Sequence, residues 1–293
     1  MKKGLPYSGR VCQAPVTYRG SASCNGANVP KCLALVIGVD DRRRLRSALL
    51  GTADATFVAS VAEVLQALRA DRSAIRAVVL EARDASGRPT AGLARQITRL
   101  FPATPVIGYC SLRAEDSQDI IALSSAGVHE LLFKHQDDHA TLLRTILLSA
   151  EQACVADLVL HHLGTRLPPR IRPLVEYSLT NPEEAHSVEQ VARALGVHRK
   201  TLVNQCKVEG FPPPGAVIAW CLLLLTAGLL AAPGVTVERI AVQLNFPSAT
   251  ALRNMLKRYT GLRPAELRGA TALESLCARF LVMPVRTPAA SPS

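Results

Sequence analysis

The stretch "TVERIAVQLNFPSATALRNMLKRYTGLRPAELR", residues 236–268, gives the clearest indication of how the C-terminal part of the chain folds. Thr236 and Ser248 are favourable N-cap residues, and each is followed by apolar residues at helical spacing. Asn245 stands between the two patterns, and asparagine tolerates the left-handed backbone that a tight turn requires. Leu252 and Leu256 are expected on the buried face of the second helix. The stretch therefore predicts two short helices joined by a tight turn.

The same plan occurs about 50 residues earlier, in "HSVEQVARALGVHRKTLVNQCKVEG", residues 186–210. Ser187 with Gln190 three residues later predicts a capping box at the start of a first helix. Gly196 permits a sharp turn, and a second helix is expected to start near His198. Helix, short turn and helix form the helix-turn-helix motif, whose second helix enters the major groove of DNA. The alternative is a helical hairpin with a solvated basic face.

The outward faces of the two second helices carry the side chains expected to contact DNA. Arginine and lysine can donate to guanine or to phosphates, and asparagine can pair with adenine. Alanine is small enough to let the backbone approach and to touch a thymine methyl group. The candidate DNA-binding residues are Arg199, Lys200 and Asn204 in the first unit, and Ser248, Ala249, Thr250, Arg253, Asn254 and Lys257 in the second.

Two such units with a helix between them resemble the DNA-binding domain of the AraC family of transcription regulators. The resemblance covers about residues 170–268, and "IAVQLNF", Ser248 and "LKRYTGLRPAELR", with Gly261 and Pro264, carry its most specific part. It implies a sequence-specific DNA-binding transcription regulator. By this resemblance the residues that face bases are Lys200, Asn204, Ala249, Thr250 and Asn254. The departures from the family pattern, which concern the turn and core packing, are Cys206, Asn245, Leu252 and Leu256.

Between the two units lies the apolar stretch "GAVIAWCLLLLTAGLLAAPG", residues 215–234. The uncharged run around it is long enough to span a bilayer, so one alternative is a membrane-tethered regulator anchored by residues 215–232. A span would place the two units on opposite sides of a membrane, and one could then never meet DNA. We therefore predict a connecting helix of about 18 residues and no membrane partner. Because it is apolar all round, its outer face is expected to pack on the N-terminal domain or on a second subunit.

The middle of the chain alternates short apolar runs with amphipathic helical patterns. Five such alternations predict a doubly wound parallel five-stranded sheet with helices on both faces. The fold class is therefore α/β for this part and all-α for the part that follows. The expected strands are 32–39, 56–61, 77–80, 104–110 and 130–134, and the expected helices are 43–50, 61–70, 90–100, 115–126 and 138–163.

Polar residues stand at the carboxyl ends of these strands, where such sheets bind their ligands. They are Asp40, Asp41, Glu81, Cys110 (or Ser111, if the register shifts by one residue) and Lys134. With "VDDRRRLRSALL" and "AGVHELLFK", they make residues 33–150 similar to the receiver domain of two-component response regulators. The resemblance implies an acidic pair that holds Mg²⁺ and a lysine that grips a phosphoryl group.

Departures from the receiver pattern predict a degenerate pocket. Glu81 stands where the family has the phosphoaccepting aspartate, and His135 stands where a proline normally follows the lysine. The longer glutamate could mimic the phosphorylated state. Two alternatives are a phosphorylation-controlled response regulator with Mg²⁺-dependent chemistry and, less favoured, Asp84 as a substitute acceptor. A third is that the acidic pair only caps the next helix and that Lys134 is a solvated charge.

Charge and composition point to a polyanionic partner. The net charge is +11, and residues 165–293 hold fifteen basic and eight acidic residues. We expect double-stranded DNA as partner, a homodimer, and RNA polymerase as a further candidate partner. The eight cysteines form no C-x-x-C pair, which suits the reducing cytoplasm. We found no hydrolase triad, P-loop or metal motif, and therefore expect no enzyme, cofactor or metal.

The chain divides into five predicted segments. They are a disordered basic tail (1–31), a receiver-like domain (32–150), a linker helix and hinge (151–170), an AraC-type DNA-binding domain (171–270) and a C-terminal tail (271–293).

Overall fold

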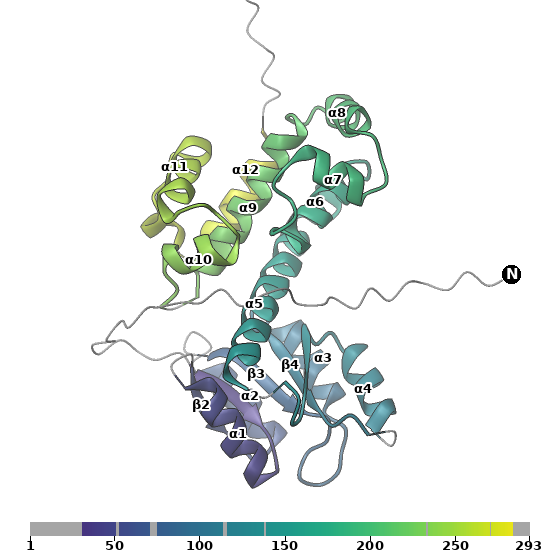
Figure 1. Cartoon of the computed structure of the whole chain (residues 1–293), viewed down its shortest axis with the longest axis vertical. Coiled ribbons are helices and arrows are strands. Elements are labelled where there is room, and N and C mark those ends of the chain that lie inside the picture. Colours follow the sequence, from purple (N-terminus) through teal and green to yellow (C-terminus); the bar gives the residue numbers. More distant parts are fainter. Residues whose placement is uncertain are drawn as a thin grey trace, which may run out of the picture.

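The structure is a computed structural model with a sheet-containing part at one end and a helical part at the other (Figure 1). It describes residues 31–50, 53–70, 75–113, 116–137, 139–232, 234–269 and 271–283. The tail predicted at residues 1–31 lies outside the described residues, except for Lys31.

The N-terminal part is a parallel five-stranded sheet with the order β2-β1-β3-β4-β5, which confirms the predicted doubly wound fold. This order, in which the chain reverses direction across the sheet after β2, is common among doubly wound parallel sheets. β3 and β4 are buried on both faces, which explains their nearly continuous apolar runs. The strands are β1 (Lys31–Leu35), β2 (Asp54–Phe57), β3 (Ile75–Glu81), β4 (Val106–Cys110) and β5 (Glu130–Phe133).

Two apolar clusters cover the two faces of this sheet. One cluster joins the strands to the first and fifth helices, through residues such as Leu45 and Leu147. The other joins them to the second, third and fourth helices, through residues such as Leu68, Ile97 and Leu123. The helices are α1 (Val39–Leu49), α2 (Val61–Ala70), α3 (Ala91–Leu100), α4 (Ser117–Ser124) and α5 (Ala140–Leu163).

The boundary between β1 and α1 differs from the sequence prediction. β1 ends at Leu35 rather than at residue 39, and α1 begins at Val39 rather than at residue 43. Asp40 and Asp41 therefore lie in the first turn of α1, where acidic side chains complement the helix dipole.

α5 runs on beyond the sheet and enters the core of the helical part (Figure 1). Leu143 and Leu147 pack on the sheet, whereas Val155, Val159 and Leu163 belong to the helical core. One helix thus serves both cores. The helices that follow are α6 (Arg172–Thr180), α7 (Val188–Ala194), α8 (Arg199–Val208), α9 (Pro214–Leu230), α10 (Val237–Gln243), α11 (Ala249–Thr260) and α12 (Ala272–Leu281), with short 3₁₀ turns η3 (Gly164–Arg166) and η4 (Pro264–Leu267).

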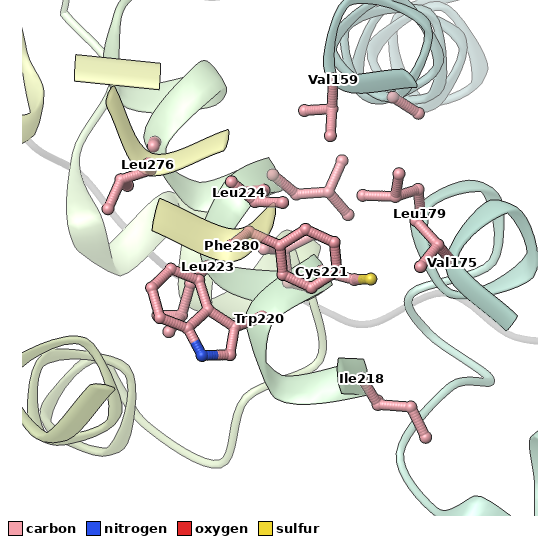
Figure 2. Packing of buried hydrophobic residues seen from close by; sticks show 14 of the residues in the cluster. Val159, Val175, Leu179, Ile218, Trp220, Cys221, Leu223, Leu224, Leu276 and Phe280 are labelled. Atoms are coloured by element: carbon pink, nitrogen blue, oxygen red, sulfur yellow. The ribbon is translucent and has the colours of Figure 1, made fainter. Parts of the chain in front are cut away.

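The apolar stretch of the sequence forms α9, the central helix of the helical part. Leu223 and Leu224 are fully buried, and side chains from α5, α6 and α12 surround them (Figure 2). The prediction that its outer face packs on the sheet domain or on a second subunit is therefore wrong. Helices of the same bundle cover that face, including two that the sequence analysis did not identify. Within the described residues, no helix has both the length and the hydropathy needed to cross a membrane.

The two unidentified helices are α6 and α12. Leu174 and Leu179 of α6 contribute to the core that surrounds α9. α12 contributes Leu276 and Phe280, and the centroid of the Phe280 ring lies 6.2 Å from the ring centroid of Trp220 in α9. Residues 272–281 are thus a structural helix rather than part of a tail, and residues 284–293 lie outside the described residues.

A buried set of three charges joins the sheet part to the helical part. The Glu151 carboxylate of α5 accepts a hydrogen bond from Arg76 of β3 and another, at 2.7 Å, from Arg239 of α10. The Arg76 and Glu151 side chains are 7% and 8% exposed, and the Arg239 side chain is 26% exposed. Gln243 of α10 adds a hydrogen bond of 3.0 Å to the Leu148 carbonyl. α10 is thus fastened to the helix that leaves the sheet.

Candidate nucleic-acid interface

Two pairs of short helices, α7–α8 and α10–α11, flank the central pair α9 and α12 (Figure 1). The first helix of each pair begins at the expected cap. Ser187 Oγ accepts from the Gln190 amide at 3.2 Å, and Thr236 Oγ1 accepts from the Arg239 amide at 3.2 Å. The predicted capping box is only half formed, because the Gln190 side chain bonds the Ser187 hydroxyl rather than its backbone amide.

The turns within the two pairs have the same backbone geometry. Gly196 and Asn245 adopt left-handed φ angles of 66° and 54°. The next residue in each turn donates back to the helix, from Val197 to the Ala192 carbonyl at 2.9 Å and from Phe246 to the Ala241 carbonyl at 2.7 Å. These are the bonds of a Schellman motif, which ends a helix sharply. The prediction that Asn245 takes the role of the turn glycine is confirmed.

The second helix of each pair has its own N-cap. His198 Nδ1 accepts from the Lys200 amide at 3.1 Å, and Ser248 Oγ accepts from the Ala251 amide at 3.1 Å. Because Pro247 precedes Ser248, the second turn is one residue longer than the first. The predicted inner residues are buried in both pairs: Leu202, Cys206, Leu252 and Leu256.

Counted from these caps, the outward faces of α8 and α11 correspond position by position. The second, sixth and ninth positions lie on one face, opposite the buried fourth and eighth positions. The three matched pairs are Lys200 with Thr250, Asn204 with Asn254, and Lys207 with Lys257, and all six residues are exposed. The sequence analysis did not include Lys207, although its match to Lys257 in the second unit was a signal that could have found it.

The other candidate residues differ in their surroundings. Arg199 forms an ion pair of 3.1 Å with Glu189 of α7, and Arg253 is paired with Glu238 of α10. Both pairs are partly exposed at the surface, where ion pairs are weak and can exchange for a phosphate. Ala249 is half-buried against the helical core, whereas Ser248 is exposed and serves as the cap of α11.

A second polar site lies at the carboxyl end of the sheet. Lys134 Nζ donates to Asp41 at 2.8 Å and also to Glu81, whose other oxygen accepts from the Ile37 amide at 2.6 Å. Burial lowers the pKa of the Lys134 ammonium, but its hydrogen bonds to the two carboxylates raise that pKa above its usual value. The raised pKa keeps the Lys134 ammonium protonated between the two carboxylate side chains that it bonds.

Two predicted members of this pocket lie elsewhere. Asp40 points to solvent and pairs with Arg43 at 3.4 Å, because neighbouring residues of a helix point in different directions. The Cys110 thiol is buried among apolar side chains, and this burial raises its pKa to about 11. The residue after the strand, Ser111, lines the pocket instead. The acidic pair and the cysteine of the sequence prediction are therefore corrected to Asp41 and Ser111.

The comparison with family models bears on the helical part. Residues 191–270 match the model described as "Helix-turn-helix domain". The chain contains a helix-turn-helix domain. The match spans α8, α9, α10 and α11 and the end of α7, so the two helix pairs described above are its two helix-turn-helix units. This domain indicates a function in DNA-binding transcription regulation.

Similar solved structures include a response regulator receiver domain from Clostridium thermocellum, with 18% identity over 42% of this chain and 94% of that chain and a TM-score of 0.37. Full-length FixJ from B. japonicum has 16% identity over 80% and 98% of the two chains and a TM-score of 0.37. The response regulator RcsB in complex with DNA has 15% identity over 80% and 100% and a TM-score of 0.34. A comparison with curated proteins finds no match.

Among the described residues, no three His, Cys, Asp or Glu side chains are placed to hold a metal ion.

Proposed function

We propose that this chain is a sequence-specific DNA-binding transcription regulator of the AraC type. The observation that carries the proposal is the matched pair of outward faces on α8 and α11. Each face has an asparagine at the sixth position and a lysine at the ninth position after the cap, with a buried leucine at the fourth. Asparagine pairs with adenine in the major groove, and lysine neutralises phosphates.

Each of the two helix-turn-helix units reads one major groove in this proposal. Both units pack on α9, which therefore holds them as one body. Two recognition helices held in this way are suited to successive grooves on one face of the duplex, about 34 Å apart. The residues proposed to contact DNA are Arg199, Lys200, Asn204, Lys207, Ser248, Ala249, Thr250, Arg253, Asn254 and Lys257.

The sheet part serves dimerisation or protein contact in this proposal, rather than phosphotransfer. Lys134 is already satisfied by Asp41 and Glu81, and Asp40 points away, so an acidic pair for Mg²⁺ is not assembled. We propose a homodimer, with RNA polymerase as a further partner, and no enzymatic activity. The boundaries proposed are 32–150 for the sheet domain and, because α12 packs on α9, 171–281 for the DNA-binding domain.

Selection of bound sequences from random DNA with the purified full-length protein tests the first part. We expect enrichment of two short elements whose centres lie about one helical turn apart. Enrichment of no sequence would overturn the proposal.

Incubation with acetyl phosphate and Mg²⁺, followed by intact-mass measurement, tests the second part. We expect an unchanged mass, because Glu81 and Lys134 form an ion pair with each other in the pocket. A phosphoryl adduct would instead support the phosphorylation-controlled alternative.

Light scattering on the purified protein is expected to give the mass of two chains, and a single-chain mass would contradict the homodimer.

A further inference from the structure

A cavity of about 620 Å³ lies where the sheet part meets the helical part. The sheet contributes Ile75 and Arg76 at the start of β3 and the loop 100–105 between α3 and β4. α5 forms one wall, and the end of α9 with the segment around Arg268 forms another. The cavity therefore lies at the amino ends of the strands, opposite the Lys134 pocket, which is at the carboxyl ends and measures about 140 Å³.

The size and the walls of this cavity suit a small organic molecule. Ligand pockets in proteins usually measure about 300–1,000 Å³ and have mainly apolar walls with a few polar groups. The apolar wall residues include Phe101, Leu158, Leu229 and Leu273. α5 and α9 cross closely beside it, since a Cβ atom added to Gly228 would lie 2.3 Å from Val155 Cγ1. The two helices are therefore in close contact where they line the cavity.

The polar groups around the cavity carry an excess of positive charge. The Glu151 carboxylate is shared by Arg76 and Arg239, so this set of three keeps one net positive charge. Arg268 lies at another side of the cavity, and its guanidinium donates to the Val235 carbonyl at 2.7 Å and to the Leu230 carbonyl at 3.5 Å. These two bonds fix its position, but no carboxylate of the described residues lies within 4.0 Å of it.

We propose that this cavity binds a small organic carboxylate with an apolar body. The body would lie among the apolar wall residues, and the carboxylate would accept from Arg268, to which arginine's forked donors are suited. The proposal does not depend on DNA binding. Because the cavity adjoins the Arg76–Glu151–Arg239 set, a bound molecule would contact the link between the sheet and the second helix-turn-helix unit.

Isothermal titration calorimetry with full-length protein tests the proposal with two matched probes, naphthalene-2-carboxylate and naphthalene-2-carboxamide. The probes share one shape and differ in charge. We expect one molecule of carboxylate per chain and at least about tenfold weaker binding of the amide. Absence of binding of both probes, or equal affinity for the two, would overturn the proposal.

Three variants assign any binding to this cavity. Ala232→Trp places an indole in the cavity at a half-buried position, and it is expected to abolish binding. Ala62→Trp adds the same side chain at an exposed position of α2, and it is expected to leave binding unchanged.

Arg268→Gln can keep a hydrogen bond to a backbone carbonyl without the charge. It is expected to weaken carboxylate binding about tenfold and amide binding little. Because Arg268 is exposed, this variant is informative even if Ala232→Trp fails to fold. Carboxylate binding that Arg268→Gln leaves unchanged would contradict the assignment.

Discussion

The two helix-turn-helix units are built on the same local plan but are attached differently to the rest of the molecule. Both end their first helix with the same pair of backbone bonds around a left-handed residue. The first unit packs on α6 and α9. The second packs on α9 as well, but Arg239 and Gln243 of α10 also hold it to α5, the helix that leaves the sheet. The two units thus share the geometry of the turn between their helices. The bonds from Arg239 and Gln243 to α5, which connect to the sheet domain, belong to the second unit.

Removing the shared carboxylate of this connection gives the largest expected effect. Glu151→Ala leaves Arg76 and Arg239 partly or fully buried without their common partner. The free energy of unfolding is expected to fall by about 3–5 kcal/mol, as measured by urea denaturation. The matched variant Glu189→Ala removes an exposed partner in the first unit and is expected to cost less than about 1 kcal/mol. Similar losses for both variants would remove the distinction between the units.

Substitutions at the two turn residues, Gly196 and Asn245, are expected to have effects of intermediate size on the free energy of unfolding. Gly196→Ala places a Cβ atom at a left-handed φ of 66° and is expected to cost about 1–2 kcal/mol. Asn245→Gly relieves the same constraint in the second unit and should change the unfolding free energy by less than about 0.5 kcal/mol in the favourable direction. Thermal unfolding of both variants checks this. A stable Gly196→Ala protein would mean that the first turn does not depend on glycine.

The serine caps are expected to contribute equally in the two units. Ser187→Ala and Ser248→Ala each remove an acceptor for a helix amide and should cost about 1 kcal/mol. The glycine variants at the same positions should cost only a few tenths of a kcal/mol in the same unfolding experiment. A clear loss of DNA affinity in Ser248→Gly, where stability is kept, would show that the hydroxyl also contacts DNA.

The smallest expected effect concerns the two matched lysines. Lys207→Gln and Lys257→Gln should each reduce the slope of log affinity against log salt by about 0.9, the value for one phosphate contact. Fluorescence anisotropy with a fixed DNA site at several salt concentrations measures this slope. Arg69→Gln, at an exposed position of α2 in the sheet part, is the control and should leave the slope unchanged. A slope change in only one of the lysine variants would mean that the two faces do not meet DNA alike.

Elements with strong periodicity were predictable from the sequence. The five strands and the helices α1–α5 follow from apolar runs and helical spacing, and the turn at Asn245 follows from its tolerance of left-handed backbone. α6 is short and has a proline in its first turn, so the sequence analysis did not identify it. α12 had a clear signal, since Leu273, Leu276, Cys277 and Phe280 recur at helical spacing. It was missed because the family pattern ends at residue 268.

Which side chains enter a pocket was harder to predict than where a strand ends. β4 is buried on both faces, so alternation of apolar and polar residues could not set its register, and Cys110 and Ser111 stayed open as alternatives until the structure placed Ser111 at the pocket. The prediction that Asp40 and Asp41 enter the pocket as a pair depended on where α1 begins, and that start was misplaced by four residues. Glu151 bonds Arg76, which lies 75 positions before it in the sequence, and Arg239, which lies 88 positions after it. Only the folded chain brings these three residues together.

Selection from random DNA with the variants Asn204→Ala and Asn254→Ala tests the central claim most directly. Each variant removes the exposed amide at the sixth position of one recognition helix and leaves the other helix intact. We expect each variant to lose sequence preference at one element of a two-part site and to keep the other element, with a cost of about 1–3 kcal/mol at the affected base pair. Loss of the same element in both variants, or of neither, would contradict the assignment of one recognition helix to each groove.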